Sequence, residues 1–236
     1  MPGTSYRKLE IHLDDYRVYQ AYNSSMNENT KKIRQIVSGG LGPCLTNAGF
    51  HRHGAGFSRK YGEALHVVDF QLDKWNSKEL GKFTLNIGAH FTSVAALLFG
   101  TDPMPVNPKE SHCLLRARVG LLMPEHRDHW WSVTSETDGD SMSQELAIVC
   151  SSFILPWLEQ FKTLAHVDWK PRRGVWIQHR LAEAAANLVL GDRVRAAQCI
   201  EAQLAQITDD PADSKLKEER VNRTRAWAVE HGIQVS

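Results

Sequence analysis

The stretch LGKFTLNIGAHF at residues 80–91 decides the fold. Its residues alternate between two sets: Phe83, Leu85, Ile87, Ala89 and Phe91 are apolar, and Lys82, Thr84, Asn86, Gly88 and His90 stand between them. Strict alternation places the two sets on opposite faces of an extended chain and is typical of antiparallel sheets. The stretch therefore predicts a half-buried antiparallel strand.

Segments on both sides of this stretch have the same period of two. Residues 57–61 and 64–75 flank a Tyr61-Gly62-Glu63 turn, which predicts a hairpin, and residues 112–122 form a further strand after a proline-containing loop. In that strand Arg116 and Arg118 face away from the apolar side chains. We expect a meander-like sheet of about five strands, with one apolar and one polar face.

Helical periodicity dominates the rest of the chain. Residues 29–49 carry one apolar stripe, interrupted by glycines and a proline that indicate either a break or close packing. Residues 141–164 carry another stripe, and residues 176–190, 192–207 and 213–230 follow as helices. The fold class is therefore α+β: an N-terminal helix, an antiparallel sheet, and a C-terminal helical layer of four or so helices. We expect a sheet domain at 1–165 and an appended helical part at 166–236.

Charge and cysteine usage limit the partners. The chain has 28 Lys and Arg against 27 Asp and Glu, so it lacks the basic excess that gathers nucleic acid. Four widely spaced cysteines without a CxxC pair indicate free thiols in a reducing compartment. The segment Met1 to Tyr16 does not resemble a signal peptide, and the longest nearly uncharged stretch, 141–157, is too short and polar to span a bilayer. We expect a cytoplasmic protein that binds neither nucleic acid nor membrane.

The polar face of the sheet is the first candidate site. If the strands pair in sequence order, five polar side chains converge there: Arg59, Gln71, Asn86, Arg116 and Arg118. Arginine forks bind carboxylate or phosphate in a bidentate manner. The alternative is an exposed face whose arginines pair with Asp69 and neighbouring carboxylates.

Trp130 and Trp131 follow the last predicted strand. Adjacent residues of an extended chain point to opposite sides, so one tryptophan can enter the core while the other stacks on a ligand or partner. The alternative is that both pack at the edge of the sheet.

Familiar catalytic and cofactor motifs do not occur. The pairs His51-x-His53 and His126-x-x-His129 lack carboxylates at ligand spacing, so we expect no metal site. The chain has no GxSxG elbow and neither of the common glycine-rich phosphate loops. We therefore expect no cofactor, and the catalytic residues, if any, are not identified.

Six short motifs occur in a fixed order: Asn47-Ala-Gly-Phe50, Gly56-Phe-Ser-Arg59, Val68-Asp-Phe-Gln71, Phe83-Thr-Leu-Asn-Ile-Gly88, Arg116-Ala-Arg-Val-Gly120 and Trp130-Trp131. In this order they resemble an uncharacterised bacterial family, domain of unknown function 4304, over residues 33–164. The resemblance implies the boundaries of the fold. It implies no activity, cofactor or catalytic residue.

Two functions from different classes remain open. The first is a non-catalytic binding protein whose polar sheet face engages another protein or a small acidic ligand; a neutraliser of a bacterial toxin is one form of it, by analogy with small α+β proteins in that role. The second is an enzyme acting on a small anionic substrate, with Arg116 and Arg118 as a clamp and His90 or His112 as acid or base. Self-association through the C-terminal helical hairpin, giving a homodimer, is a further possibility.

Overall fold

The structure is a computed structural model that describes residues 27–101, 104–170, 173–211 and 214–235. The segment Met1 to Tyr16, on which the signal-peptide argument rests, lies outside the described residues. Within the described ranges, every helix is too short or too polar to cross a bilayer.

The predicted strand at 80–91 is the centre of the sheet. Strand β4 (Gly81–His90) pairs antiparallel with β3 (Ala64–Leu72) along one edge, and along the other with β5 (Leu115–Arg118) and then β6 (Trp131–Val133). Beyond β3 lie β2 (Gly56–Tyr61) and β1 (His51–His53), and beyond β5 lies β7 (Val175–Ile177). The described residues form a 7-stranded antiparallel sheet, so the α+β class and the meander-like order are confirmed.

The expectation that β4 is half-buried is wrong. Thr84 and His90 are 0% exposed and Asn86 is 5% exposed, although all three lie on the side assigned to the polar face. The reason is a second layer over that face: a 3₁₀ turn at Glu110–His112 brings Cys113 onto Gly88, where a side chain on the strand would collide with the cysteine sulfur. A glycine at that position lets the turn lie directly on the sheet.

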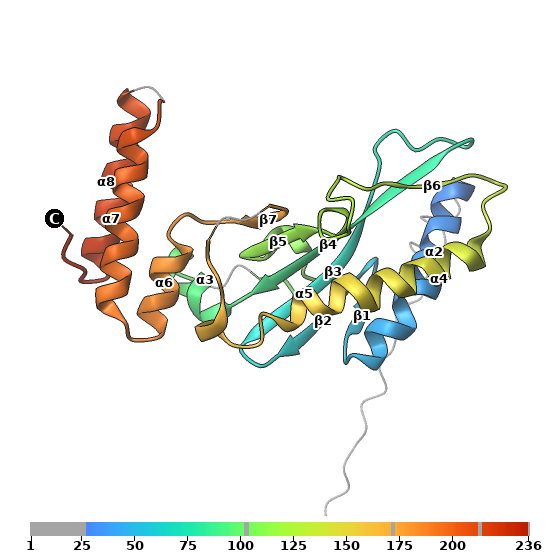
Figure 1. The fold of residues 1–236 in the computed structure, drawn as a ribbon, viewed down its shortest axis with the longest axis horizontal. Helices are drawn as coiled ribbons and strands as arrows, with labels where there is room; N and C mark the ends of the chain where they lie inside the picture. The colour runs from blue at the N-terminus through green and yellow to red at the C-terminus, as the bar shows by residue number, and fades with distance from the viewer. Residues whose placement is uncertain (1–26, 102–103, 171–172, 212–213, 236) are drawn as a thin grey trace, which may run out of the picture.

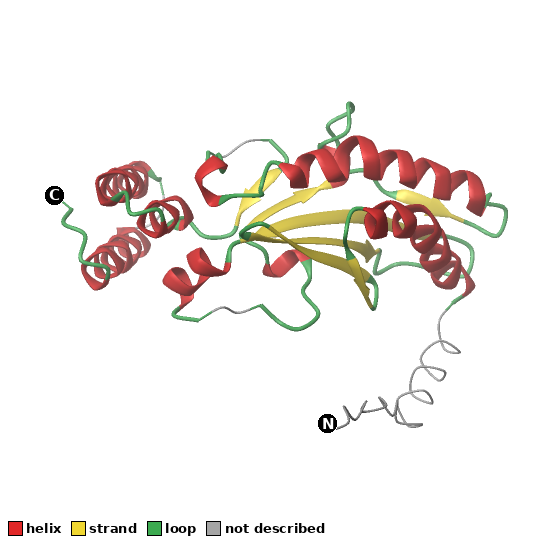
Figure 2. Cartoon of the chain, turned by 90° about the horizontal axis from the view of Figure 1, so that it is seen from below, coloured by secondary structure: helices red, strands yellow, loops and turns green. Residues whose placement is uncertain are grey.

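The opposite face of the sheet is covered by helices α2 (Glu28–Asn47) and α4 (Gly139–Val149). A π-helical segment (Cys150–Ile154) and α5 (Leu155–Glu159) continue α4 along the sheet (Figures 1 and 2). Helix α2 runs through its glycines and proline without a break, because Gly40 packs against the backbone of Ser143 on α4. Of the two expected alternatives, close packing is therefore correct.

The remaining helices gather beyond one end of the sheet (Figure 1). They are α3 (Thr92–Phe99), α6 (Ala182–Val189), α7 (Arg193–Asp209) and α8 (Ser214–Glu230). Gly191 has a φ of 81° and Asp192 accepts a hydrogen bond from the Arg195 N–H at 2.8 Å, which makes the predicted stop and N-cap between α6 and α7. The helix expected from residue 176 begins only at Ala182, because residues 175–177 form β7 instead.

Candidate functional site

The face of the sheet opposite α2 and α4 holds a cavity of about 910 Å³, here called the sheet cavity. Four sequence-predicted side chains line it: Gln71, Asn86, Arg116 and Arg118. Strand register explains their meeting, because Asn86 is paired with Asp69 on one side and with Arg118 on the other, and paired residues share a face. Gln71 lies two residues beyond Asp69 and so points the same way.

Arg116 is held by Glu110 from the covering turn. Its Nε donates to Glu110 Oε1 at 2.8 Å, and its Nη2 donates to the same oxygen. The side chain of Glu110 is 13% exposed and that of Arg116 is 33% exposed. The ion pair therefore fixes the guanidinium at the wall of the cavity while leaving part of it open to solvent.

Arg118 is held by three neighbours. Its Nη1 donates to both carboxylate oxygens of Asp128, at 2.7 and 2.6 Å, and its Nη2 donates to Gln71 Oε1 at 3.2 Å. The indole of Trp130 lies 5.5 Å from the guanidinium carbon and donates from Nε1 to Asp128 at 3.1 Å. Both arginines thus pair with carboxylates, but with Glu110 and Asp128 rather than with Asp69.

Asp69 lies among these groups, and no arginine of the described residues forms an ion pair with it. Its Oδ2 accepts a hydrogen bond from the Glu110 backbone N–H at 2.8 Å. Burial raises the pKa of Asp69 from 3.8 to about 6, and the nearby charge of Glu110 adds to the increase, while the bonds from the Glu110 backbone and the Asn86 side chain oppose it. The cavity therefore contains a carboxyl group that changes charge near neutral pH.

His53, at the end of β1, also lines the sheet cavity. Burial lowers its pKa from the ordinary 6.5, which favours the neutral form of the ring. Its Nε2 is buried and has no hydrogen-bond partner among the described residues. A neutral imidazole with an unused nitrogen is able to donate or accept a proton.

The expected convergence of Arg59 with the other polar residues is wrong. Arg59 pairs with His66 across the hairpin and lies on the helix-covered face, where it is 6% exposed. It forms an ion pair with Glu159 of α5 and donates to the Ala48 carbonyl at 2.6 Å. The guanidinium carbon lies 4.2 Å from the centre of the Tyr61 ring. Arg59 therefore ties the sheet to the helices from the side opposite the cavity.

The side chains of the two tryptophans lie in different surroundings, as expected for adjacent residues of an extended chain, although only Trp131 belongs to β6. Trp131 is 3% exposed, stacks on Phe83 with ring centres 5.4 Å apart, and donates to Glu145 at 2.7 Å. Trp130 stays half-buried beside Arg118. Trp131 is thus a core residue, and Trp130 stands beside the cavity.

The histidines named for acid or base chemistry do not line the sheet cavity. His90 is 0% exposed inside the sheet, and His112 Nδ1 accepts a bond from the Lys109 N–H at 2.9 Å in the covering turn. Across the described residues there is no cluster of three or more His, Cys, Asp or Glu side chains suited to a metal ion.

Three lining residues were not predicted from the sequence in any role: Glu110, Asp128 and Trp176. Asp69 was expected only as a partner of the arginines, and His53 only as a member of a histidine pair. Asp69 was detectable, since it lies two residues from Gln71 on the same strand and so shares its face. Glu110 and Asp128 come from loops, whose position over a sheet has no periodic signal in the sequence.

Comparison with known protein families gives a match to part of the chain. The family model described as a domain of unknown function, DUF4304, matches residues 41–160. No curated protein and no solved structure matches significantly.

Proposed function

The chain belongs to the DUF4304 family, a domain of unknown function, so we propose its function from the cavity itself. We propose that it is a binding protein whose sheet cavity takes up an acidic group of a partner protein or ligand. The observation that carries the proposal is the meeting of Arg116, Arg118 and Asn86 in one cavity of about 910 Å³. A cavity of this size is typical of sites that enclose a small molecule or a few side chains.

Arg116 is held in position and still has free N–H donors for an acidic group. A guanidinium has five N–H donors, and the bonds from Arg116 to Glu110 use only Nε and Nη2. A carboxylate entering the cavity can accept from the remaining donors or take the place of Glu110. Since the ion pairs already hold the side chains in position, little rotamer freedom is lost on binding.

Attraction at long range contributes little to this binding. The ionisable lining groups balance, with Lys109, Arg116 and Arg118 against the acidic set Asp69, Glu110 and Asp128. Recognition then depends on direct hydrogen bonds rather than on the field of the whole protein. We expect affinity to fall only modestly between about 50 and 200 mM salt, unlike the steep loss of nucleic-acid binders.

Co-purification tests the proposal. A tagged protein isolated from its native host with a moderate-salt wash should retain a stoichiometric partner, identified by mass spectrometry, and Arg116→Ala should lose it while the melting temperature stays within a few degrees. Lys78→Ala, which removes an exposed cation outside the cavity lining, is the matched control. Citrate and inorganic phosphate serve as small anionic probes in a thermal-shift assay of the same variants. Retention of every partner and probe by Arg116→Ala would refute the proposal.

A narrower form of the proposal is that the partner is a bacterial toxin. Its support is the analogy with small α+β proteins that neutralise toxins, not a feature of the cavity. Co-expression with a toxin-like protein encoded beside this one should then restore growth, and Arg116→Ala should abolish the rescue.

An enzyme acting on a small anionic substrate is the second candidate, and His53 favours it. The His53 imidazole and the Asp69 carboxyl, whose pKa is about 6, line the same cavity as the arginines and would serve as the base and the acid. Turnover of a panel of anionic esters and phosphate monoesters, lost in His53→Gln, would support this function. Recovery of every bound molecule unchanged would favour binding alone.

A further inference from the structure

Strand β7 presents an unpaired edge. On its inner side it pairs with β5, and Gln178 continues the ladder by donating to the Leu114 carbonyl at 2.8 Å. In an antiparallel pair every second residue bonds to the neighbouring strand, and the residues between direct their N–H and C=O groups away from it. Val175 and Ile177 are those intervening residues. Within the described ranges, the outward N–H and C=O groups of these two residues form no backbone hydrogen bond.

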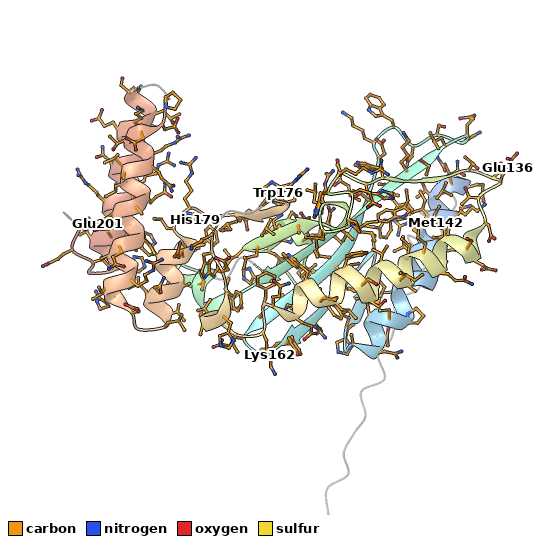
Figure 3. All side chains as sticks on the ribbon, in the orientation of Figure 1. Glu136, Met142, Lys162, Trp176, His179 and Glu201 are labelled. Atoms are coloured by element: carbon orange, nitrogen blue, oxygen red, sulfur yellow. The ribbon has the colours of Figure 1, made fainter. Side chains whose placement is uncertain are left out.

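A second cavity, of about 430 Å³ and here called the edge cavity, lies along this strand. It is lined by all three residues of β7, and on the far side by Gln198, Ala202 and other residues of α7. Successive strand residues point to opposite faces, so a cavity that touches all three runs along the edge rather than over one face. Figure 3 shows Trp176 on β7 and His179 between this strand and the C-terminal helices.

Trp176 connects the edge cavity to the sheet cavity, since its side chain lines both. It is paired with Arg116, so the two side chains lie on the same face of the sheet. The indole is 48% exposed. A chain lying along β7 would therefore direct alternate side chains past Trp176 toward Arg116.

Helix α7 lines the side of the edge cavity that lies away from β7. An added strand lies about 4.8 Å from its neighbour and brings only one chain to that position. We take a single extended segment as the occupant, because a second copy of this protein would bring a whole sheet and its covering helices into a space that α7 bounds.

Charge indicates the chemistry of that segment. Three of the lining arginines are paired: Arg116 with Glu110, Arg118 with Asp128 and Arg195 with Glu183. Arg180 and Lys109 add positive charge to the two cavities, against the carboxyl of Asp69. Below a pH of about 6, where Asp69 is protonated, the excess is larger. An acidic segment is therefore favoured over a basic one.

We propose that an extended acidic segment of a partner protein pairs with β7 as an additional strand and directs an acidic side chain past Trp176 into the sheet cavity. This rests on the proposed binding function and names its partner class. Main-chain hydrogen bonds to Val175 and Ile177 supply affinity, and the arginines supply specificity, as in other cases of strand addition.

The decisive variant is Ile177→Pro. Proline removes the outward N–H of residue 177 but none of the bonds to β5, and edge strands tolerate it. Ile177→Val keeps the N–H and is the matched control. Circular dichroism and the melting temperature of both variants establish that the sheet is intact.

The probe is a phage-displayed library of random heptapeptides selected against the whole protein, with the enriched peptides then measured by fluorescence anisotropy. We expect enrichment of acidic residues, and binding weakened at least ten-fold by Ile177→Pro and by Arg116→Ala but not by Ile177→Val. Methylation of alternate peptide nitrogens in the ligand should weaken binding to a similar extent.

The outcomes separate this inference from the proposed function. Peptides that bind equally to Ile177→Pro and fail only with Arg116→Ala would overturn strand addition and leave the binding cavity standing. The same holds if no peptide is enriched while citrate or phosphate still stabilises the protein through Arg116. Sedimentation could instead show dimers whose fraction rises with protein concentration and which Ile177→Pro abolishes. That result would overturn the proposal of a partner segment and show that β7 pairs with a second copy of this protein.

Discussion

Replacing Asp69 by asparagine should stabilise the protein at pH 7.5 and have little effect at pH 4. The folded-state pKa of Asp69 is about 6, against 3.8 for the free side chain, mainly because the carboxyl is buried. Between pH 3.8 and pH 6, therefore, the folded protein holds a proton on Asp69 that the unfolded chain releases. The stability that this proton provides is complete below pH 3.8 and is lost as the pH rises through 6. At about 1.4 kcal/mol per pKa unit, the loss is about 3 kcal/mol.

The introduced asparagine side chain carries no charge at any pH, so the variant avoids this loss. Its side-chain oxygen can still accept from the Glu110 N–H, although the bond from Asn86 to the carboxylate is not reproduced. The pKa of about 6 already includes that bond, so the pH dependence follows from the pKa shift alone. Because a small part of the loss has already occurred at pH 4, we expect Asp69→Asn to gain about 2 kcal/mol at pH 7.5 relative to pH 4.

The assay is urea denaturation of the wild type and Asp69→Asn at several pH values from 4 to 8. The difference between the two proteins must be used, because His66 has the opposite effect on the wild type. Burial lowers the pKa of His66 from 6.5 to about 4, so its contribution is complete above pH 6.5 and is lost as the pH falls toward 4. Glu136→Gln in an exposed loop makes the same change in net charge and is the control. A stability difference independent of pH would contradict the reasoning.

Two further changes test the packing beneath the site. Arg59→Ala should destabilise the fold by about 2–4 kcal/mol in urea denaturation, because it removes a buried guanidinium from Glu159 and from the Ala48 carbonyl, and a change under about 0.5 kcal/mol would contradict its structural role. Gly40→Ala should lower the free energy of unfolding by about 1–3 kcal/mol, because the added methyl group meets Ser143 of α4. Gly42→Ala lies in the same helix but has open space around it, so it should be neutral or stabilising by up to about 1 kcal/mol. Equal melting temperatures for the two glycine variants would count against the close contact of the helices.

The central strand β4 could be predicted from the sequence, whereas the edge strand β7 could not. Alternation over residues 80–91 locates β4 because ten strand residues show the period clearly. Strand β7 has only three residues after Gly174, too few to show alternation, and it depends on β5, which is remote in sequence. No local pattern separates such a strand from the start of a helix.

The face of the sheet that holds the cavity could be predicted from which residues of each strand point to the same side. Arg59 was assigned to the wrong face because this alternation was not followed through the turn. A turn at Gly62-Glu63 pairs Tyr61 with Ala64 and therefore Arg59 with His66. Even-numbered residues of β3 then share a face with Arg59, which puts Gln71 on the other one. The turn residues in the sequence were sufficient for this step. The carboxylates that hold the arginines were not predictable, since they arrive on loops.

The position of β7 also matters for how the family region behaves alone. Residues 41–160 contain β5 but not β7. A fragment with these limits would leave the outer backbone groups of β5 without their strand, next to the apolar Leu115 and Ala117. Exposed sheet edges of this kind recruit other chains, so such a fragment should aggregate at concentrations where the full chain stays dispersed. On this reasoning, β7 keeps the edge of the family region from pairing with other copies of the chain.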